Sequence, residues 1–330
     1  LHIKYENMGV FLRGKYWYDS AIENNSVAYG NGPSATVETA DIMNTTTFAL
    51  ETGVTYNPNE KLDDSGFDDL SKGSGATLLD AFVYGQFDLG EMPIDVRLGK
   101  QVVSWGESTF IQGGVNSINP VDASAFRRPG AEIKEGLLPV GMAYTNLGLT
   151  DNLSAEIFYQ YEYQNTVSDA CGTFFSTSDI AAEGCNTLAV RGGTFSISRD
   201  DSAVEEPSDD GQFGIALRYF VESIETEFGL YGMTIHSRAP IYNVVADNSN
   251  DFTTALKVAP ADTLYLGQPA GQFAPFYAFV PGGIATAVTG GRIADTRYAI
   301  SYPEDNKLVG LSFSTNLAGM AVSGEVSHKI

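Results

Sequence analysis

The chain has 330 residues and a mass of 35.4 kDa, enough for one large β domain or two ordinary domains. Its 41 acidic residues against 19 lysines and arginines give a formal net charge of −22, which would repel a phosphate backbone and argues against nucleic-acid binding. Hydrophobic residues make up 43% of the chain, too many for disorder, while a mean hydropathy of −0.09 and the lack of an apolar run of about eighteen residues exclude a bundle of membrane helices.

Apolar and polar residues alternate with a period of two, and this pattern predicts β-strands. Residues 1–5 and 10–19 form the first predicted hairpin, and residues 79–89 and 94–101 form the second. The further strands are predicted at 139–147, 153–164, 212–219, 226–236, 309–314 and 322–327. The sequence therefore predicts about ten strands, arranged as roughly five hairpins.

Short and long connections alternate along the chain. Turns of about three to five residues close each hairpin, whereas roughly 30 to 70 residues separate successive hairpins, as in barrels with short periplasmic turns and long external loops. The strand lengths also match the ~9–11 residues that cross a bilayer at a tilt. We therefore expect an all-β chain that is a transmembrane antiparallel up-and-down β-barrel of the bacterial outer membrane. Residues 327–330 lack the usual terminal aromatic residue, so we expect a fragment of a longer barrel chain.

Residues 1–330 are thus expected to form a single, partial barrel domain, with long external loops at 20–75, 165–210 and 237–305. The first two loops are acidic, and we hypothesise that they bind divalent cations that bridge lipopolysaccharide phosphates. Clustered carboxylates are typical calcium ligands, but the EF-hand spacing is missing here, so a plain acidic loop is the favoured interpretation. The weak metal candidates are Asp63, Asp64, Asp68 and Asp69.

The chain has two cysteines, Cys171 and Cys185, in a stretch rich in small and polar residues. This arrangement predicts a loop disulfide in an oxidising compartment, with two free thiols as the alternative. Such a bridge would contribute roughly 3 kcal/mol on the chain-entropy model.

Residues 106–138 show neither a strand period nor a helix period and contain the densest positive charge in the chain, so we expect them to fold inward as a constriction. The residues expected at the lumen or constriction are Arg97, Trp105, Glu107, Asn119, Asp122, Arg127, Arg128 and Lys134. The arginines would pair with lumen carboxylates, for which Asp80, Asp95, Glu156 and Glu162 are the candidates. A structural latch without a ligand is the alternative.

Residues 264–284 are apolar, aromatic and interrupted by prolines, although they lie in a connection that should face water. They could pack on the barrel mouth, touch lipid or line an entrance for a hydrophobic molecule. The candidate entrance residues are Phe273, Phe276, Tyr277 and Phe279.

Several segments together resemble a known family. These are 97–108 (RLGKQVVSWGES), 118–122 (INPVD), 132–135 (EIKE), 137–139 (LLP) and 302–305 (YPED). They are similar to a proteobacterial outer-membrane β-barrel family catalogued as domain of unknown function one-three-zero-two, from about residue 76 onward. The resemblance implies a barrel of unsettled function, often encoded near a periplasmic protein resembling lipoprotein carriers and near exporters of hydrophobic compounds. It supplies no catalytic or ligand residues.

We therefore expect an outer-membrane channel or transporter of a Gram-negative bacterium for small hydrophobic or amphipathic molecules of the lipid or hydrocarbon type. A general porin, or a non-transporting structural or adhesive surface protein, is the alternative. An enzyme is not expected, because the three histidines, His2, His236 and His328, lie in no catalytic motif. No cofactor is expected. The expected partners are outer-membrane lipid, lipopolysaccharide and a periplasmic lipid-carrier-like protein; the cargo and the oligomeric state stay open.

Overall fold

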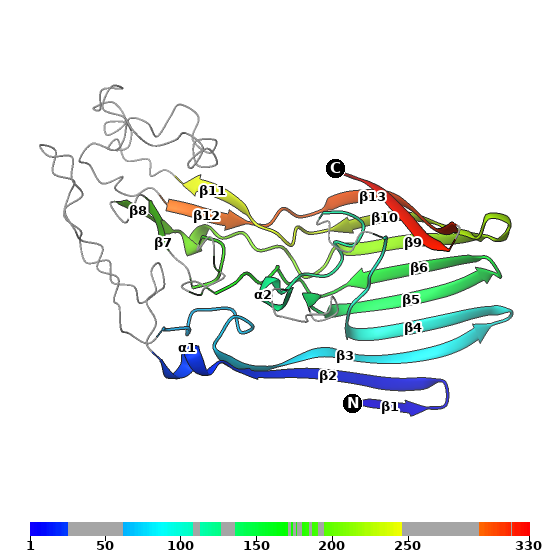
Figure 1. Cartoon of the computed structure of the whole chain (residues 1–330), viewed down its shortest axis with the longest axis horizontal. Helices are drawn as coiled ribbons and strands as arrows, with labels where there is room; N and C mark the ends of the chain where they lie inside the picture. Colours follow the sequence, from blue (N-terminus) through cyan, green and yellow to red (C-terminus); the bar gives the residue numbers. More distant parts are fainter. Residues whose placement is uncertain are drawn as a thin grey trace, which may run out of the picture.

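The computed structural model describes residues 1–25, 62–107, 113–126, 136–170, 173, 176, 180–184, 187–190, 195–245, 297–317 and 319–330. The fold is all-β, with one ten-stranded sheet and one four-stranded sheet (Figure 1). The helical elements are α1 (Ser20–Asn24), α2 (Ala123–Phe126), η1 (Asp201–Ala203) and η2 (Glu222–Ile224). Within the described ranges, no helix has the length and apolar character needed to cross a membrane.

The ten-stranded sheet is antiparallel throughout, and its strands are ordered β1-β2-β3-β4-β5-β6-β9-β10-β13-β14. The strands are β1 (His2–Tyr5), β2 (Met8–Tyr18), β3 (Ser74–Leu89), β4 (Met92–Gln101), β5 (Val140–Thr150), β6 (Leu153–Gln160), β9 (Gln212–Val221), β10 (Thr226–Ile235), β13 (Asn306–Leu317) and β14 (Met320–Lys329). All the predicted hairpins are confirmed. The alternation of side chains along each strand is a local pattern, and the paired strands keep it.

Every hairpin turn lies at one end of this sheet, and the long connections lie at the other end (Figure 1). The turns are tight and use left-handed backbone, as at Gly90, where φ is 69°. Glu225 adopts the same region without being glycine, with φ 46° and ψ 42°. The predicted alternation of short and long connections is therefore confirmed.

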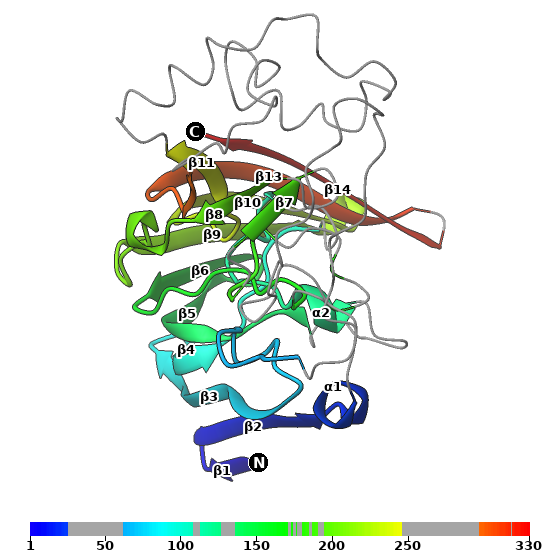
Figure 2. The same cartoon turned by 90° about the vertical axis from the view of Figure 1, so that its left-hand side faces the viewer.

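The sheet is a curved, open trough (Figure 2). Closure of a barrel requires that the first and last strands pair. Among the described residues, β1 pairs with β2 alone and β14 pairs with β13 alone. The ten strands therefore form an open sheet, whose curvature leaves the two edge strands on opposite sides of the trough (Figures 1 and 2); the all-β antiparallel part of the prediction is confirmed, and the closed barrel, expected only of a longer chain, stays a prediction.

A second sheet occupies part of the connections that were predicted to be loops. Its strands, in the order β11-β12-β8-β7, are β7 (Thr187–Val190), β8 (Phe195–Arg199), β11 (Ile241–Val245) and β12 (Arg297–Ser301). Beside it, Tyr298, Ile300 and Tyr302 form a small buried cluster. The expectation of plain loops over 165–210 and 237–305 is therefore wrong at these strands, which are only four or five residues long and too short for a clear period.

The two faces of the large sheet differ in chemistry. On one face, which we name the outer face, large apolar side chains are exposed in β3, β4, β6, β9, β10, β13 and β14. Examples are Val83, Phe87, Val96, Leu98, Ile157, Tyr159, Phe213, Ile215, Tyr219, Phe228, Leu230, Val309, Leu311, Phe313 and Val326. The opposite, inner face carries polar side chains and is partly covered by other segments of the chain. Because side chains alternate across a strand, the period of two sorted these residues onto separate faces.

Candidate functional site

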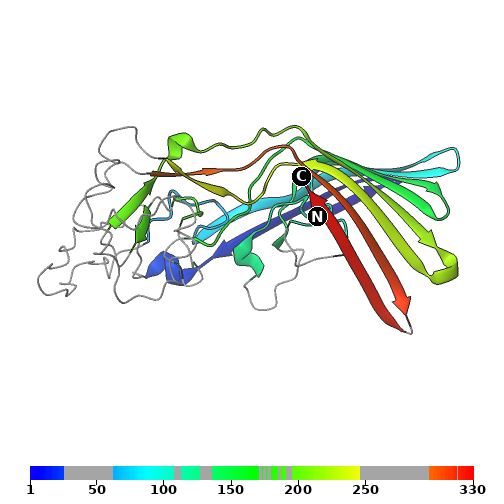
Figure 3. The same ribbon diagram turned by 90° about the horizontal axis from the view of Figure 1, so that it is seen from above.

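The connection between β4 and β5 lies against the inner face of the sheet. We name its described residues, within 102–139, the inward segment. Val103, Trp105, Val115 and Ile118 are buried in it, and they form one cluster with inner-face residues of β5, β6, β9, β10 and β13. Figure 3 shows the part of this segment around α2 on the concave side of the curved strands. The described residues of the segment 106–138 thus lie against the inner face, and their role as a constriction stays a prediction.

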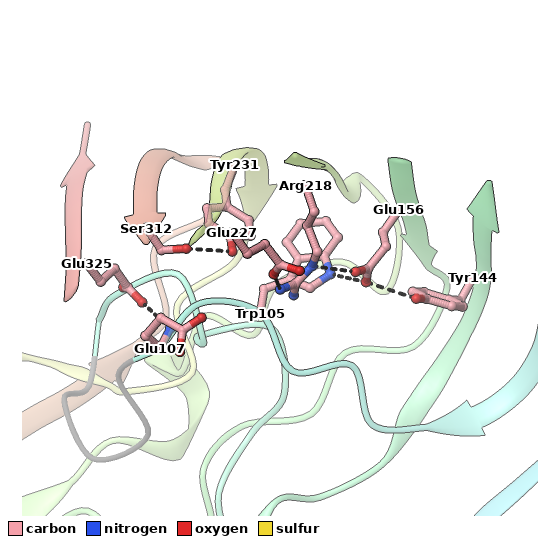
Figure 4. Close-up of polar contacts among 9 residues, drawn as sticks. All are labelled: Trp105, Glu107, Tyr144, Glu156, Arg218, Glu227, Tyr231, Ser312 and Glu325. Atoms are coloured by element: carbon pink, nitrogen blue, oxygen red, sulfur yellow. Dashed lines mark hydrogen bonds and ion pairs between the residues drawn. The ribbon is translucent and has the colours of Figure 1, made fainter. Parts of the chain in front are cut away.

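A polar network joins the inward segment to the middle of the inner face (Figure 4). Glu156 of β6 accepts hydrogen bonds from Trp105 Nε1 at 2.8 Å and from the Tyr144 hydroxyl at 2.9 Å, both on Oε2. Its Oε1 accepts the Nε–H of Arg218 at 2.8 Å. The carboxylate therefore connects the inward segment with strands β5 and β9.

Arg218 extends the network toward the other side of the trough. Its guanidinium pairs with Glu227 of β10 at 3.1 Å and lies 5.9 Å from the ring centre of Tyr231. The Tyr231 hydroxyl is 2.9 Å from the Ser312 hydroxyl on β13. The inner face thus carries a continuous band of charged, hydroxyl and aromatic groups across neighbouring strands, in which Tyr144, Tyr231 and Ser312 are buried.

The inward segment is attached near both edges of the sheet. Toward β14, the Glu325 carboxylate accepts the backbone N–H groups of Glu107 and Val115, each at 3.0 Å. Toward β2, Lys15 pairs with the fully buried Asp122 at 3.3 Å. Gly106 has a φ of 76° and lies against Glu325, where a side chain would collide with the carboxylate. The segment therefore spans the trough from one side to the other.

Asn119 fixes the internal shape of the inward segment. Its Oδ1 accepts the N–H of Val103 at 2.9 Å, and its Nδ2 donates to the carbonyl groups of Gln101 at 3.2 Å and Leu138 at 2.9 Å. One amide group thus joins the start, middle and end of the connection. Trp105, Glu107, Asn119 and Asp122 all belong to the inward segment, and these three hydrogen bonds of Asn119 are all with backbone groups.

A buried arginine that the sequence analysis missed holds the same segment from the side of the long connections. Arg238 is 8% exposed and donates to the carbonyl oxygens of Ile118 and Gln164, each at 3.0 Å, and to the side-chain oxygen of Gln160. Its guanidinium also lies 5.1 Å from the ring centre of Tyr163. Burial lowers the pKa of Arg238 to about 10, since all these partners are neutral.

The predicted partners of the lumen charges differ from those observed. Arg97 lies over the ring of Tyr144, with 4.3 Å between guanidinium carbon and ring centre. The carboxylates proposed as its partners contact other groups. These contacts are Asp80 with Arg13, Asp95 with Gln86, Glu156 with Arg218, and Glu162 with Lys100. Arg127, Arg128 and Lys134 lie outside the described residues. The sequence analysis did not name Lys15 and Arg218 as lumen residues. Each lies in a strand between apolar neighbours, and only the register between strands shows which carboxylate it meets.

The four aspartates suggested as calcium ligands serve separate local contacts. Asp63, Asp64 and Asp68 accept backbone N–H groups of Ser65, Gly73 and Leu70 respectively, and Asp69 pairs with Lys72. No group of three or more metal-ligating side chains gathers anywhere in the described part of the chain. The weak calcium interpretation therefore gains no support from their placement.

His236 is buried, and backbone groups meet both of its ring nitrogens. Nδ1 accepts the N–H of Asp305 at 3.1 Å, so Nε2 carries the hydrogen and donates to the carbonyl of Asp210 at 2.9 Å. This arrangement fixes a neutral ring between two loops, a structural role. Cys171 and Cys185, as well as the entrance candidates Phe273, Phe276, Tyr277 and Phe279, lie outside the described residues, and their predictions remain predictions.

One family model matches residues 1–329 of the chain, and its description reads "Protein of unknown function (DUF1302)". No curated protein matches the chain in sequence. The family resemblance drawn from the motifs is thereby confirmed, and it extends over the first strands as well.

Proposed function

The chain belongs to the DUF1302 family, and from this premise we propose that it is an outer-membrane channel or transporter for small hydrophobic or amphipathic molecules. One observation carries the proposal: the curved antiparallel sheet exposes apolar side chains on its outer face, while its inner face carries a charged network and an apolar cluster that the inward segment covers. These features correspond to the wall and the constriction of a membrane pore.

The membrane location is supported by the extent of the outer face. Its apolar side chains, such as Leu230 at 51% and Leu311 at 60% exposure, form a surface that continues over neighbouring strands. Contiguous apolar surface of this kind marks contact with lipid or with another protein. In a bilayer the outward residues would meet acyl chains, while every backbone group must be paired within the protein. We therefore propose that further strands at β1 and β14 complete a transmembrane barrel.

Transport is supported by the inward segment. Glu325, Lys15 and Arg238 each hold it, so the segment narrows the trough at a defined place. Beside it, Arg218 and Glu227 keep 22% and 41% of their side chains exposed next to the buried ring of Tyr231, and we take these charged groups as the polar contacts of an amphipathic cargo.

The test compares passage of two probes across the outer membrane of cells that produce the full chain and of cells that lack it. The hydrophobic probe is N-phenylnaphthylamine, followed by its fluorescence in membranes, and the polar probe is nitrocefin, followed by hydrolysis through a periplasmic β-lactamase. We expect faster uptake of N-phenylnaphthylamine and unchanged nitrocefin hydrolysis. Faster entry of nitrocefin would instead indicate a general porin. No change for either probe would indicate a structural or adhesive surface protein.

A further inference from the structure

The large sheet has a break on one side of β3. β2 pairs with β3 as far as Ser74, whereas β4 pairs with β3 only as far as Ala81, the partner of Lys100. After Gln101 the chain leaves the sheet and enters the inward segment. In the described part of the chain, residues 74–80 of β3 therefore have no ladder partner on the β4 side (Figure 1). β5 begins at the same level, with Val140 opposite Gln101, so β2 and β3 extend beyond the strands beside them, and we use the word break for this step in the edge of the sheet.

A cavity of about 370 Å³ lies at the break. Leu78, one of its lining residues, is 54% exposed on the outer face. Leu79 and Leu138 also line the cavity, and both belong to the apolar cluster on the inner side of the sheet. The cavity therefore reaches from the outer face toward the interior, and its volume lies within the range of small-molecule sites.

The charge around the cavity is mainly negative. Asp68, Asp69 and Glu183 line it together with Lys100, whose ammonium group already pairs with Glu162 at 2.5 Å. Burial raises the pKa of Asp68, and the charges of Asp69 and Asp122 raise this pKa further. Burial likewise raises the pKa of Glu183, with Asp68 as the next cause. A cationic group placed between these carboxylates would gain favourable interactions from them.

We propose that this cavity binds an amphipathic molecule that carries a primary ammonium group. The apolar part of the molecule lies along Leu78, Leu79 and Leu138, and the ammonium group lies between Asp68 and Glu183. The ligand enters from the outer face, beside residues 74–80 of β3, where β4 and β5 do not extend. The evidence for the binding site is the cavity itself. Only the entry of the ligand from the bilayer depends on the proposed function.

The first test uses three probes that differ only in their polar group: hexylamine, hexanol and hexanoate. Each is titrated by calorimetry at pH 7 into the purified full chain in a non-ionic detergent. We expect hexylamine to bind at least about tenfold more tightly than hexanol, and hexanoate to show no binding, because the carboxylates attract the first and repel the third. Equal affinity for hexylamine and hexanol would overturn the proposal.

The second test uses variants of the lining. Asp68→Asn removes one charge while keeping an acceptor for the N–H of Leu70, and Thr77→Trp fills the cavity from β3. We expect each to weaken hexylamine binding about tenfold or more. The matched control is Asp63→Asn in the same segment, which lies outside the lining and should bind hexylamine like the unmodified chain. Unchanged binding in both lining variants would overturn the site.

Failure of the site and failure of the proposed function are distinguishable. If the chain speeds N-phenylnaphthylamine uptake but does not bind hexylamine, the proposed function stands and the cavity site is refuted. If the chain binds hexylamine through Asp68 but changes the passage of neither uptake probe, the cavity site stands and the transport function is refuted.

Discussion

At the scale of single residues, Glu156 joins the largest number of different elements on the inner face. It receives hydrogen bonds from the inward segment, β5 and β9, and its side chain is only 13% exposed. A carboxylate that satisfies several donors away from water stabilises a fold mainly because its loss leaves those donors unpaired.

We expect Glu156→Gln to lower the free energy of unfolding by about 2–3 kcal/mol, because Arg218 loses its closest counter-charge and the amide cannot accept all three hydrogen bonds. Thermal or urea unfolding in a non-ionic detergent measures the change. Glu91→Gln, at an exposed position in the turn between β3 and β4, is the control and should be neutral. Equal stability of the two variants would refute the role given to Glu156.

For Glu225 we predict a substitution that raises the stability of the protein, in contrast to Glu156→Gln. It closes the turn between β9 and β10 with a φ of 46°, a region that costs a non-glycine residue about 1–2 kcal/mol. We expect Glu225→Gly to raise the melting temperature. Ser223→Gly in the same turn, where φ is not positive, should leave the melting temperature unchanged or lower it, since glycine only adds entropy to the unfolded chain there. A fall for both variants would contradict this account.

At the scale of elements, the inward segment owes its position to contacts with strands that are far away in sequence. Glu325 of β14 lies 218 residues from Glu107 and 210 residues from Val115, yet it accepts hydrogen bonds from both. Lys15 of β2 holds Asp122 from the other side across 107 residues. The segment is therefore stable only while β2 and β14 keep their places in the sheet.

We expect Glu325→Ala to increase hydrogen exchange at the amides of Glu107 and Val115 by about tenfold, since each loses its acceptor, worth ~1–1.5 kcal/mol. Ser323→Ala, on the same face of β14, is the matched control. Exchange followed by mass spectrometry should show the effect in residues 103–118 and not in the strands. Identical exchange in the two variants would mean that Glu325 does not hold the segment.

At the scale of the whole molecule, the question is whether the outer face contacts water or the acyl chains of a bilayer. Leu230 lies in the middle of β10, opposite Leu311, whereas Leu317 lies at the end of β13 next to the short turn. Both are more than half exposed. In water, replacement of such residues by arginine changes stability by about ±0.5 kcal/mol or less, but the middle of a bilayer penalises arginine by about 2–4 kcal/mol and its interface by about 0–1 kcal/mol.

We therefore expect Leu230→Arg to cost about 2–4 kcal/mol when the chain is folded into lipid vesicles and unfolded with urea, and Leu317→Arg to cost at most about 1 kcal/mol. The difference between the two variants should be absent if the outer face contacts water. Equal, small effects at both positions would count against a membrane protein.

Local pattern was sufficient to predict the strands of the large sheet, their pairing into hairpins and the alternation of short and long connections. These features depend on neighbours in sequence, such as Phe213, Ile215 and Leu217, which a period of two places on one face. The motif around Trp105 also identified the family and the segment that leaves the sheet. The short strands β7, β8, β11 and β12 escaped prediction because so few residues cannot display a period.

The partners of the charged residues were decided by the tertiary structure alone. Arg218 meets Glu156 and Glu227 because the registers place Glu156 opposite Ala216 and Glu227 opposite Phe220, so the two carboxylates lie diagonally on either side of Arg218. The cavity lies where β2 and β3 extend beyond β4 and β5, next to the point at which the chain turns inward after β4 into the segment that Glu325 and Lys15 hold. Sequence alternation determines which face a side chain takes, whereas register, strand length and curvature determine what it meets there.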